Sequence, residues 1–153
     1  MNPEQKLKEM GLELLPMSES IGNYEKAVRS GNLLFMSGQG PRRPGEIVYQ
    51  GKVGREYTLE QGYEAARFTM LALLSTLKHF VGDLDNIKRI VRVTGYVNSA
   101  DDFTQHPKVV NGASDLLVEI YGDRGRHART ALGVAQLPNG IPVEVEMIVE
   151  LKA

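Results

Sequence analysis

The residues of this chain that are best placed to do chemistry lie in its last quarter, from Arg126 to Leu151. Two runs in this part alternate between apolar and polar residues, which predicts two strands. Side chains alternate between the faces of a strand, so the bulky residues of the first run share one face and Arg129 lies on the other, beside Ala131 and Gly133. A planar guanidinium with little bulk around it can bind a substrate carboxylate through two parallel hydrogen bonds.

The second run predicts a strand from Val143 to Leu151, with Glu144 and two further glutamates on one face. The pair Asn139-Gly140 between two such runs is a strong signal for a tight hairpin. A two-residue loop would place Glu144 on the face of Arg129, where its carboxylate could position or deprotonate a water molecule. A three-residue loop would reverse this parity. A solvated Arg and Glu ladder or an interface salt bridge would have the same pattern.

The rest of the chain alternates between helical and extended patterns. The expected elements are a short helix that begins at Asn2-Pro3 and ends between Gly11 and Pro16, a strand over Leu33 to Met36, a helix from Thr58 with Gln61 in the capping-box position, a strand over Ile87 to Val97, and a helix from Pro107 to Tyr121 with Gly122 as its stop. These elements predict one α+β domain over residues 1–153, in which residues 1–20 are an N-terminal helical extension. We interpret the cations at one end of the 87–97 strand (Lys88, Arg89 and Arg92) as a solvated edge.

Asn111 and Gly112 are unusual in the second long helix. Its apolar residues recur at helical spacing and predict a buried stripe, made by Val109, Ala113, Leu116 and Ile120. Asn111 lies off that stripe, and Gly112 costs helix stability unless another part of the chain approaches closely. The pair is therefore either part of a cleft wall or an exposed polar turn.

Composition limits the classes of function. With 153 residues, 42% of them hydrophobic, the chain has the size of one domain with a modest core that oligomerisation would help to stabilise. A net charge of −1 gives no overall attraction to nucleic acid, and no apolar run approaches the length of a membrane span. The chain has no Cys and no apolar signal region, so we expect a cytoplasmic location. Its three His are isolated in the sequence, so we expect no metal site.

Three motifs follow one another at a characteristic spacing. They are Gly22-Asn23-Tyr24 with Ala27-Val28, the segment Gly31 to Gln39 (GNLLFMSGQ), and Ala128-Arg129 followed by Leu137-Pro138 and Val143-Glu144-Val145-Glu146. From about Gly22 to Leu151 the chain resembles the Rid family, the reactive intermediate deaminases also known as YjgF-like proteins or endoribonuclease L-PSP. The resemblance implies a chorismate-mutase-like (bacillus type) α+β sheet with two main helices packed on one face. It also implies a homotrimer with clefts between the subunits.

The resemblance implies roles for individual residues as well. Arg129 would bind the carboxylate of an imino acid and Glu144 would orient the hydrolytic water. The same cleft would be lined by Tyr24, Ser37, Gly38 and Asn111. The implied activity resembles that of a 2-iminobutanoate/2-iminopropanoate deaminase: a reactive enamine or imine that carries a carboxylate is hydrolysed to ammonia and a 2-oxo acid. Imines hydrolyse spontaneously in water, so acid-base catalysis of about 10²- to 10⁴-fold would be enough, without a metal or cofactor.

The chain departs from the family pattern at two places. Active deaminases usually have a Cys two residues after the Arg, where this chain has Ala131, and the usual Gly-Pro-Tyr reads Gly22-Asn23-Tyr24. These differences suggest a divergent branch. The missing Cys favours an alternative, a non-catalytic trimer that binds a small metabolite through the same Arg. A ribonuclease is a third hypothesis, favoured by the basic runs Arg42-Arg43 and Arg124 to Arg129 and disfavoured by the net charge and the 7% aromatic content.

Overall fold

A five-stranded mixed sheet forms the centre of the protein. The computed structural model describes residues 2–17, 19–20 and 22–153. The strands are β1 (Ala27–Ser30), β2 (Leu33–Gln39), β5 (Ile87–Asn98), β6 (Ala128–Val134) and β7 (Val143–Leu151). They lie in the order β1-β2-β7-β5-β6, and only the β5–β6 pair is parallel. A separate short hairpin consists of β3 (Arg42–Arg43) and β4 (Glu46–Ile47).

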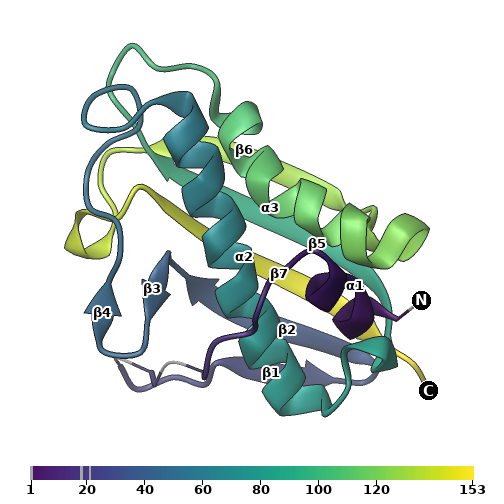
Figure 1. Ribbon diagram of the computed structural model, residues 1–153. Coiled ribbons are helices and arrows are strands. Elements are labelled where there is room, and N and C mark those ends of the chain that lie inside the picture. The colour runs from purple at the N-terminus through teal and green to yellow at the C-terminus, as the bar shows by residue number, and fades with distance from the viewer. Residues whose placement is uncertain (1, 18, 21) are drawn as a thin grey trace.

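Helices cover one face of this sheet and leave the other face open (Figure 1). The two long helices are α2 (Leu59–Val81) and α3 (His106–Tyr121), which pack side by side. The short α1 (Pro3–Glu9) lies near their C-terminal ends. The core lies between the helices and the alternate residues of β5 and β7, among them Val93, Val145 and Met147. The predicted α+β class with two main helices on one face is therefore confirmed. None of the described helices is both long and apolar enough to cross a bilayer.

Capping residues define the helices as the sequence predicts. Thr58 caps α2 through a reciprocal pair of hydrogen bonds with Gln61. Tyr121 is the last residue of α3, and Gly122 follows it with a φ of 62°. The apolar stripe predicted for α3 is buried throughout.

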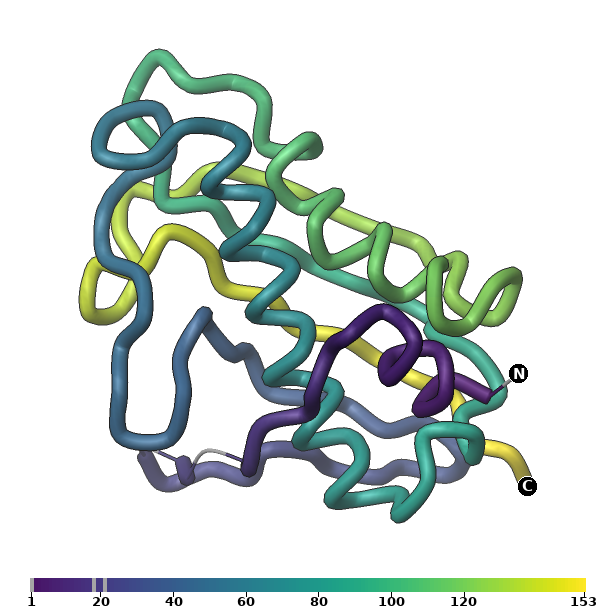
Figure 2. Tube along the Cα trace, in the orientation of Figure 1, coloured from purple at the N-terminus to yellow at the C-terminus, as the bar shows by residue number. Residues whose placement is uncertain are grey.

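The N-terminal helix α1 is shorter than expected but is firmly packed. Asn2 caps it through a capping box, and it ends at Glu9 rather than between residues 11 and 16. Leu7 is buried in the main core, while the Glu4 carboxylate pairs with Lys78 of α2 and accepts a hydrogen bond from the Leu84 amide at 3.1 Å. The helix therefore fastens the start of the chain to the end of α2. The tube in Figure 2 shows that the two chain ends lie on the same side of the molecule.

The predicted hairpin between the last two strands is wrong. β6 and β7 are not neighbours, because β5 lies between them and pairs with both. Residues Pro138–Gly140 form a single 3-10 turn, with Asn139 at a φ of 60°, in a connection that crosses one strand instead of closing a hairpin. The connection is held by residues far away in sequence: the Gly51 amide donates to the Gly140 carbonyl at 2.8 Å and the Gln50 side chain to the Asn139 carbonyl.

The prediction that the cationic end of β5 is a solvated edge of the sheet is also wrong in one respect. β5 is an interior strand. Its Lys88, Arg89 and Arg92 side chains are exposed, but each has a partner: the Glu150 carboxylate, the Arg126 carbonyl and the Thr130 hydroxyl, respectively. β6 is the true edge on this side.

Gly112 is the point at which α3 touches α2. A Cβ at this position would lie 2.0 Å from the Tyr63 carbonyl oxygen and 3.0 Å from the Arg67 nitrogen, both backbone atoms of α2. The backbone of α2 thus supplies the close approach that justifies a glycine inside a helix. It also fixes Asn111, the neighbour of Gly112, relative to the sheet.

We expect Gly112→Ala to lower the free energy of unfolding by about 1–3 kcal/mol or more, because backbone cannot move aside as a side chain can. Thermal denaturation of the wild type and the variant measures the effect. Gly62→Ala is the matched control, since a Cβ there would meet the Val53 side chain at 3.0 Å, and it should cost less. Equal melting temperatures for wild type and Gly112→Ala would contradict the close-contact explanation.

Candidate functional site

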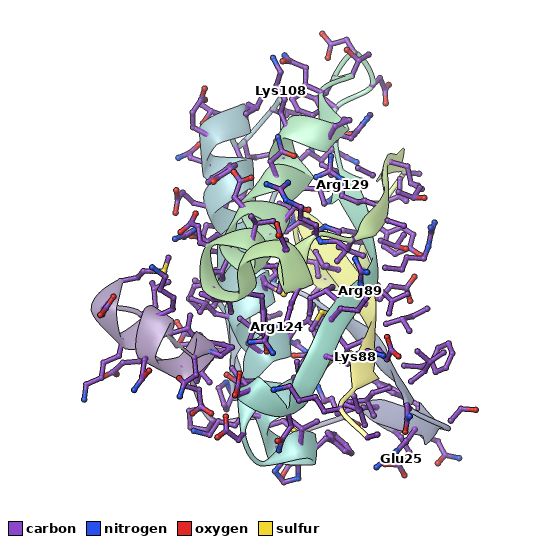
Figure 3. All side chains as sticks on the ribbon, turned by 90° about the vertical axis from the view of Figure 1, so that its right-hand side faces the viewer. Glu25, Lys88, Arg89, Lys108, Arg124 and Arg129 are labelled. Atoms are coloured by element: carbon purple, nitrogen blue, oxygen red, sulfur yellow. The ribbon has the colours of Figure 1, made fainter. Side chains whose placement is uncertain are left out.

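Arg129 extends from the edge strand β6 toward α3 (Figure 3). Its Nη1 donates hydrogen bonds to Asn111 Oδ1 at 2.7 Å and to Ser114 Oγ at 3.2 Å, and its Nη2 donates to the Pro107 carbonyl at 3.4 Å. Among the described residues, the Nε–H group has no hydrogen-bond partner. The guanidinium is therefore held through Nη1 and through one hydrogen of Nη2. The Nε–H and the second hydrogen of Nη2 remain able to bind a carboxylate side-on.

A second layer behind Arg129 was not foreseen from the sequence. His127 Nδ1 lies 2.6 Å from the Gly125 carbonyl, which places the ring proton on Nδ1, and His127 Nε2 then accepts from Ser114 Oγ at 2.9 Å. Ser114 Oγ is left to accept from Arg129. Burial, and then the charge of Arg129, lower the pKa of His127, so the neutral ring that this chain of hydrogen bonds requires is favoured.

The small residues beside Arg129 make room for α3 and not for a ligand. Ala131 packs against a buried cluster that includes Val109 and Val110 of α3, and a Cβ at Gly133 would meet the His106 ring at 2.4 Å. The prediction that this space admits a ligand is therefore wrong. What the small residues allow is the close packing that brings Asn111 to the guanidinium.

Glu144 lies in a second group of residues, on β7. Its carboxylate covers Gly38 of β2, where a Cβ would lie 3.0 Å from Glu144 Oε2. Tyr24, Gly38 and Glu144 line one cavity of about 70 Å³. Burial, followed by the charge of Glu146, raises the pKa of Glu144. A half-buried carboxylate can accept a proton from a water molecule and return it to a substrate, and the raised pKa makes it a stronger base than an ordinary carboxylate.

Arg129 and Glu144 lie on opposite faces of the sheet. Arg129 is level with Val93 of β5, which is buried under the helices, whereas Glu144 is level with Tyr96, on the open face. The prediction that they share a face within one chain is wrong. Of the predicted site residues, Asn111 accompanies Arg129, and Tyr24 and Gly38 accompany Glu144. Ser37 joins neither group through its hydroxyl, which donates to the Glu25 carbonyl at 2.6 Å and ties the approach to β1 onto β2.

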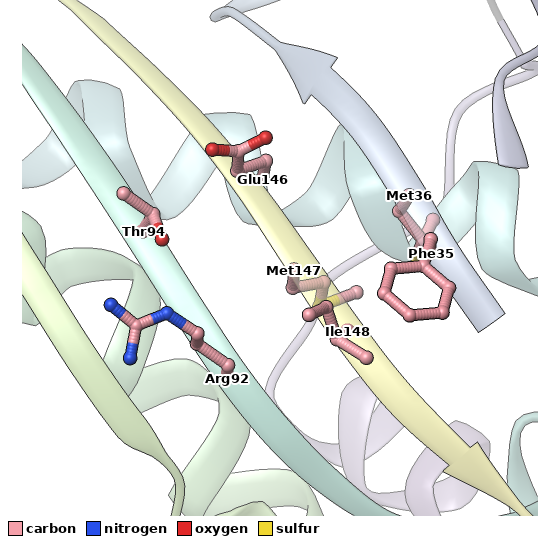
Figure 4. Close-up of a pocket in the computed structure, with 7 residues that line it drawn as sticks. All are labelled: Phe35, Met36, Arg92, Thr94, Glu146, Met147 and Ile148. Atoms are coloured by element: carbon pink, nitrogen blue, oxygen red, sulfur yellow. The ribbon is translucent and has the colours of Figure 1, made fainter. Parts of the chain in front are cut away.

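The open face around Glu144 combines charge with exposed apolar residues. Figure 4 shows part of it, where Arg92, Thr94, Glu146, Ile148 and Phe35 lie side by side on three neighbouring strands. Phe35 and Val28 are 43% and 55% exposed. The Tyr96 hydroxyl donates to Glu146, and this hydrogen bond raises the pKa of Tyr96 to about 12. An uncovered sheet face of this kind is typical of an interface between proteins.

Comparisons with known proteins place the chain in a family. A family model described as "YjgF/chorismate_mutase-like, putative endoribonuclease" matches residues 4–151. The chain belongs to the YjgF family. This match begins within α1, so the N-terminal helix, apart from its first residue Pro3, lies inside the region that the family model covers.

Relatives of this YjgF-family protein are similar over nearly their whole length. Protein TCP17 of Trypanosoma cruzi is 42% identical over 146 residues, 95% of this chain and 91% of TCP17. The RutC family protein PH0854 of Pyrococcus horikoshii is 30% identical over 84% of this chain and 86% of its own. A crystal structure of a Shewanella oneidensis protein, also described as an endoribonuclease, is 39% identical, covers 99% of this chain and 100% of its own, and has a TM-score of 0.95.

Proposed function

We propose that this protein hydrolyses reactive enamines or imines that carry a carboxylate, releasing ammonia and a 2-oxo acid. The observation that carries the proposal is the guanidinium of Arg129, which Asn111 and Ser114 hold through Nη1 while its Nε edge is left unbonded among the described residues. Family membership and the resemblance of the Arg129 and Glu144 motifs to those of deaminases point the same way.

We infer that one site would combine residues of two subunits. Because the two side chains lie on opposite faces of one sheet, a cleft that contains both is built from Arg129 of one chain and Glu144 of a neighbour. The open sheet face, with its exposed Phe35 and Val28, offers the surface through which such neighbours would pack. The arrangement that we propose is a homotrimer with one cleft at each subunit boundary.

The reaction then needs little from the protein. Arg129 binds the substrate carboxylate, which fixes the C=N carbon in the cleft. Glu144 accepts a proton from a water molecule as the oxygen attacks that carbon. That proton passes to the nitrogen, which gives a carbinolamine. Glu144 then takes a second proton from the new hydroxyl group and passes it to the nitrogen, so that the C–N bond breaks with loss of ammonia and the carbonyl of the 2-oxo acid forms. The raised pKa of Glu144 suits both halves of this proton transfer.

The experiment is to generate a range of imino acids with an amino-acid oxidase, trap what remains with semicarbazide, and measure the rate of imine loss. We expect acceleration by the wild type and a decrease of about 10²-fold or more in kcat/KM for Arg129→Ala, which loses two charge-assisted hydrogen bonds. Arg126→Ala is the matched control, because the side chain of this exposed Arg pairs with Asp123 and with no other described residue, and it should retain activity.

Two other outcomes would replace the proposal. A folded oligomer that accelerates none of the imines but still binds 2-oxo acids through Arg129 would be a metabolite-binding protein, the function that Ala131 in place of the usual Cys favours. Cleavage of RNA that persists in Arg129→Ala and depends steeply on salt would support the endoribonuclease in the family description.

A further inference from the structure

Two cations line the cavity that contains Glu144. Lys26 precedes β1, and its carbonyl accepts a hydrogen bond from the Ser37 amide at 2.9 Å. Arg42 begins β3, on the loop that follows β2. Both residues line the cavity of about 70 Å³ together with Tyr24 and Glu144. The imine hydrolysis proposed above uses neither cation.

Neither cation is neutralised by the part of the chain that the structure describes. Lys26 and Arg42 form no ion pair within 4 Å there, and their side chains make no hydrogen bond to a described residue. The adjacent Arg43 differs, since it pairs with Glu46 at 3.8 Å and its guanidinium lies over the Phe68 ring. Two neighbouring cations without a described partner thus line the same cavity.

This arrangement favours the binding of an anion. Lys26 is only 8% exposed, although its Nζ atom is not fully withdrawn from water, and a largely buried charge without a partner is unfavourable. Burial lowers the pKa of Lys26, and the nearby charge of Arg42 lowers it further. One anionic group bound between the two side chains would relieve both effects. A cavity of this size accepts such a group but not a whole substrate.

We propose that Lys26 and Arg42 form a second anion subsite, so that the preferred substrates of the cleft are dicarboxylates. One carboxylate binds to Arg129 of a neighbouring subunit, and the carboxylate at the far end of the molecule binds to Lys26 and Arg42. The inference rests on the proposed function, because it extends the cleft in which Glu144 acts. It assigns to Lys26 and Arg42 the role of specificity-determining residues that touch no reacting atom.

The test is calorimetric binding of 2-oxo acids, the products of the proposed reaction, to the intact oligomer. Three 2-oxo dicarboxylates with four, five and six carbons are each compared with the 2-oxo monocarboxylate of the same length. In at least one pair we expect the wild type to bind the dicarboxylate about tenfold or more tightly. Lys26→Met and Arg42→Gln should remove this preference and leave monocarboxylate binding unchanged. Arg43→Gln, which removes the same charge from the adjacent residue, should keep it.

The outcomes separate the subsite from the function on which it rests. Equal affinity for both members of every pair, with binding that Arg129→Ala abolishes, would overturn the subsite and leave the proposed function standing. A preference that survives in both Lys26→Met and Arg42→Gln would also overturn it. Failure of every 2-oxo acid to bind the wild type would overturn the function and the subsite together. If Lys26→Met dissociates the oligomer in sedimentation while Arg42→Gln keeps the preference, Lys26 serves subunit contact and the subsite is wrong.

Discussion

Glu144→Gln is expected to lower kcat for imine hydrolysis by about 10²- to 10⁴-fold, the contribution that a positioned acid-base group typically makes. The amide keeps the shape of the carboxylate, so it still fits over Gly38, but it cannot take a proton from water. KM should change little, because in the proposed mechanism the substrate is held by Arg129. The measurement is the trapped-imine assay at saturating substrate.

The same substitution should not destabilise the fold. Burial, followed by the charge of Glu146, raises the pKa of Glu144 in the folded state. The stability that protonated Glu144 contributes is therefore fully present below the unfolded-state pKa and is lost as pH rises through the folded pKa. Above the folded pKa the ionised carboxylate therefore costs stability, and there Glu144→Gln should melt at the same temperature as the wild type or higher. For the same reason, the pH at which the wild-type rate falls on the acid side should lie above the ordinary pKa range of a carboxyl group.

Glu150→Gln provides the control for this prediction. Glu150 is on the same strand and the same open face, and it pairs with Lys88 at 3.1 Å. Its replacement should leave kcat within about twofold of the wild type, as expected for a group that is not part of the reaction. If Glu144→Gln retains full activity, or loses activity only together with stability, Glu144 is not the base.

Mixing two inactive variants should restore activity. Arg129→Ala retains Glu144 and Glu144→Gln retains Arg129, so a mixed oligomer has intact clefts wherever the two meet in the right order. In a randomly mixed homotrimer with equal amounts of both, one half times one half, or about a quarter, of the clefts are intact. We therefore expect about a quarter of wild-type activity after the variants are unfolded and refolded together, from a background of about 1% or less.

A double variant shows whether restored activity comes from mixed clefts or only from the refolding treatment. Arg129→Ala with Glu144→Gln in one chain, refolded with either single variant, produces no intact cleft and should remain inactive. Activity restored there, or no restoration in the first mixture despite mixed oligomers in native mass spectra, would show that the two residues do not meet across a subunit boundary.

The helices could be predicted from the sequence, because the signals that specify them are local. Thr58 and Gln61 are three residues apart and cap one another, and the stripe of α3 needs only helical periodicity. The Asn139-Gly140 turn is local too, yet it did not determine which strands pair. Alternation within β6 and β7 shows which residues share a face of each strand. It does not show that β5 lies between the two strands, and because β5 lies there Arg129 and Glu144 are on opposite faces of the sheet.

The candidate site could be predicted in part for the same reason. The room beside Arg129 was visible in Ala131 and Gly133, but what fills it is α3, which precedes β6 in the chain and packs back on it. Ser114 follows Asn111 by three residues and so lies on the same side of the helix, which is the one signal that could have revealed it. The contact of Ser114 with His127 depends on tertiary packing alone.

The strand order has a consequence for synthesis of the chain. β7 is the last of these five strands to leave the ribosome, yet it is the middle strand of the sheet, with β2 on one side and β5 on the other. Until residues 143–151 emerge, the β1–β2 and β5–β6 pairs have no strand to join them, and their apolar faces stay exposed to chaperones and to aggregation. A stop codon or frameshift shortly before residue 143 should therefore yield an insoluble fragment that is cleared by proteolysis, rather than a folded protein with a trimmed end.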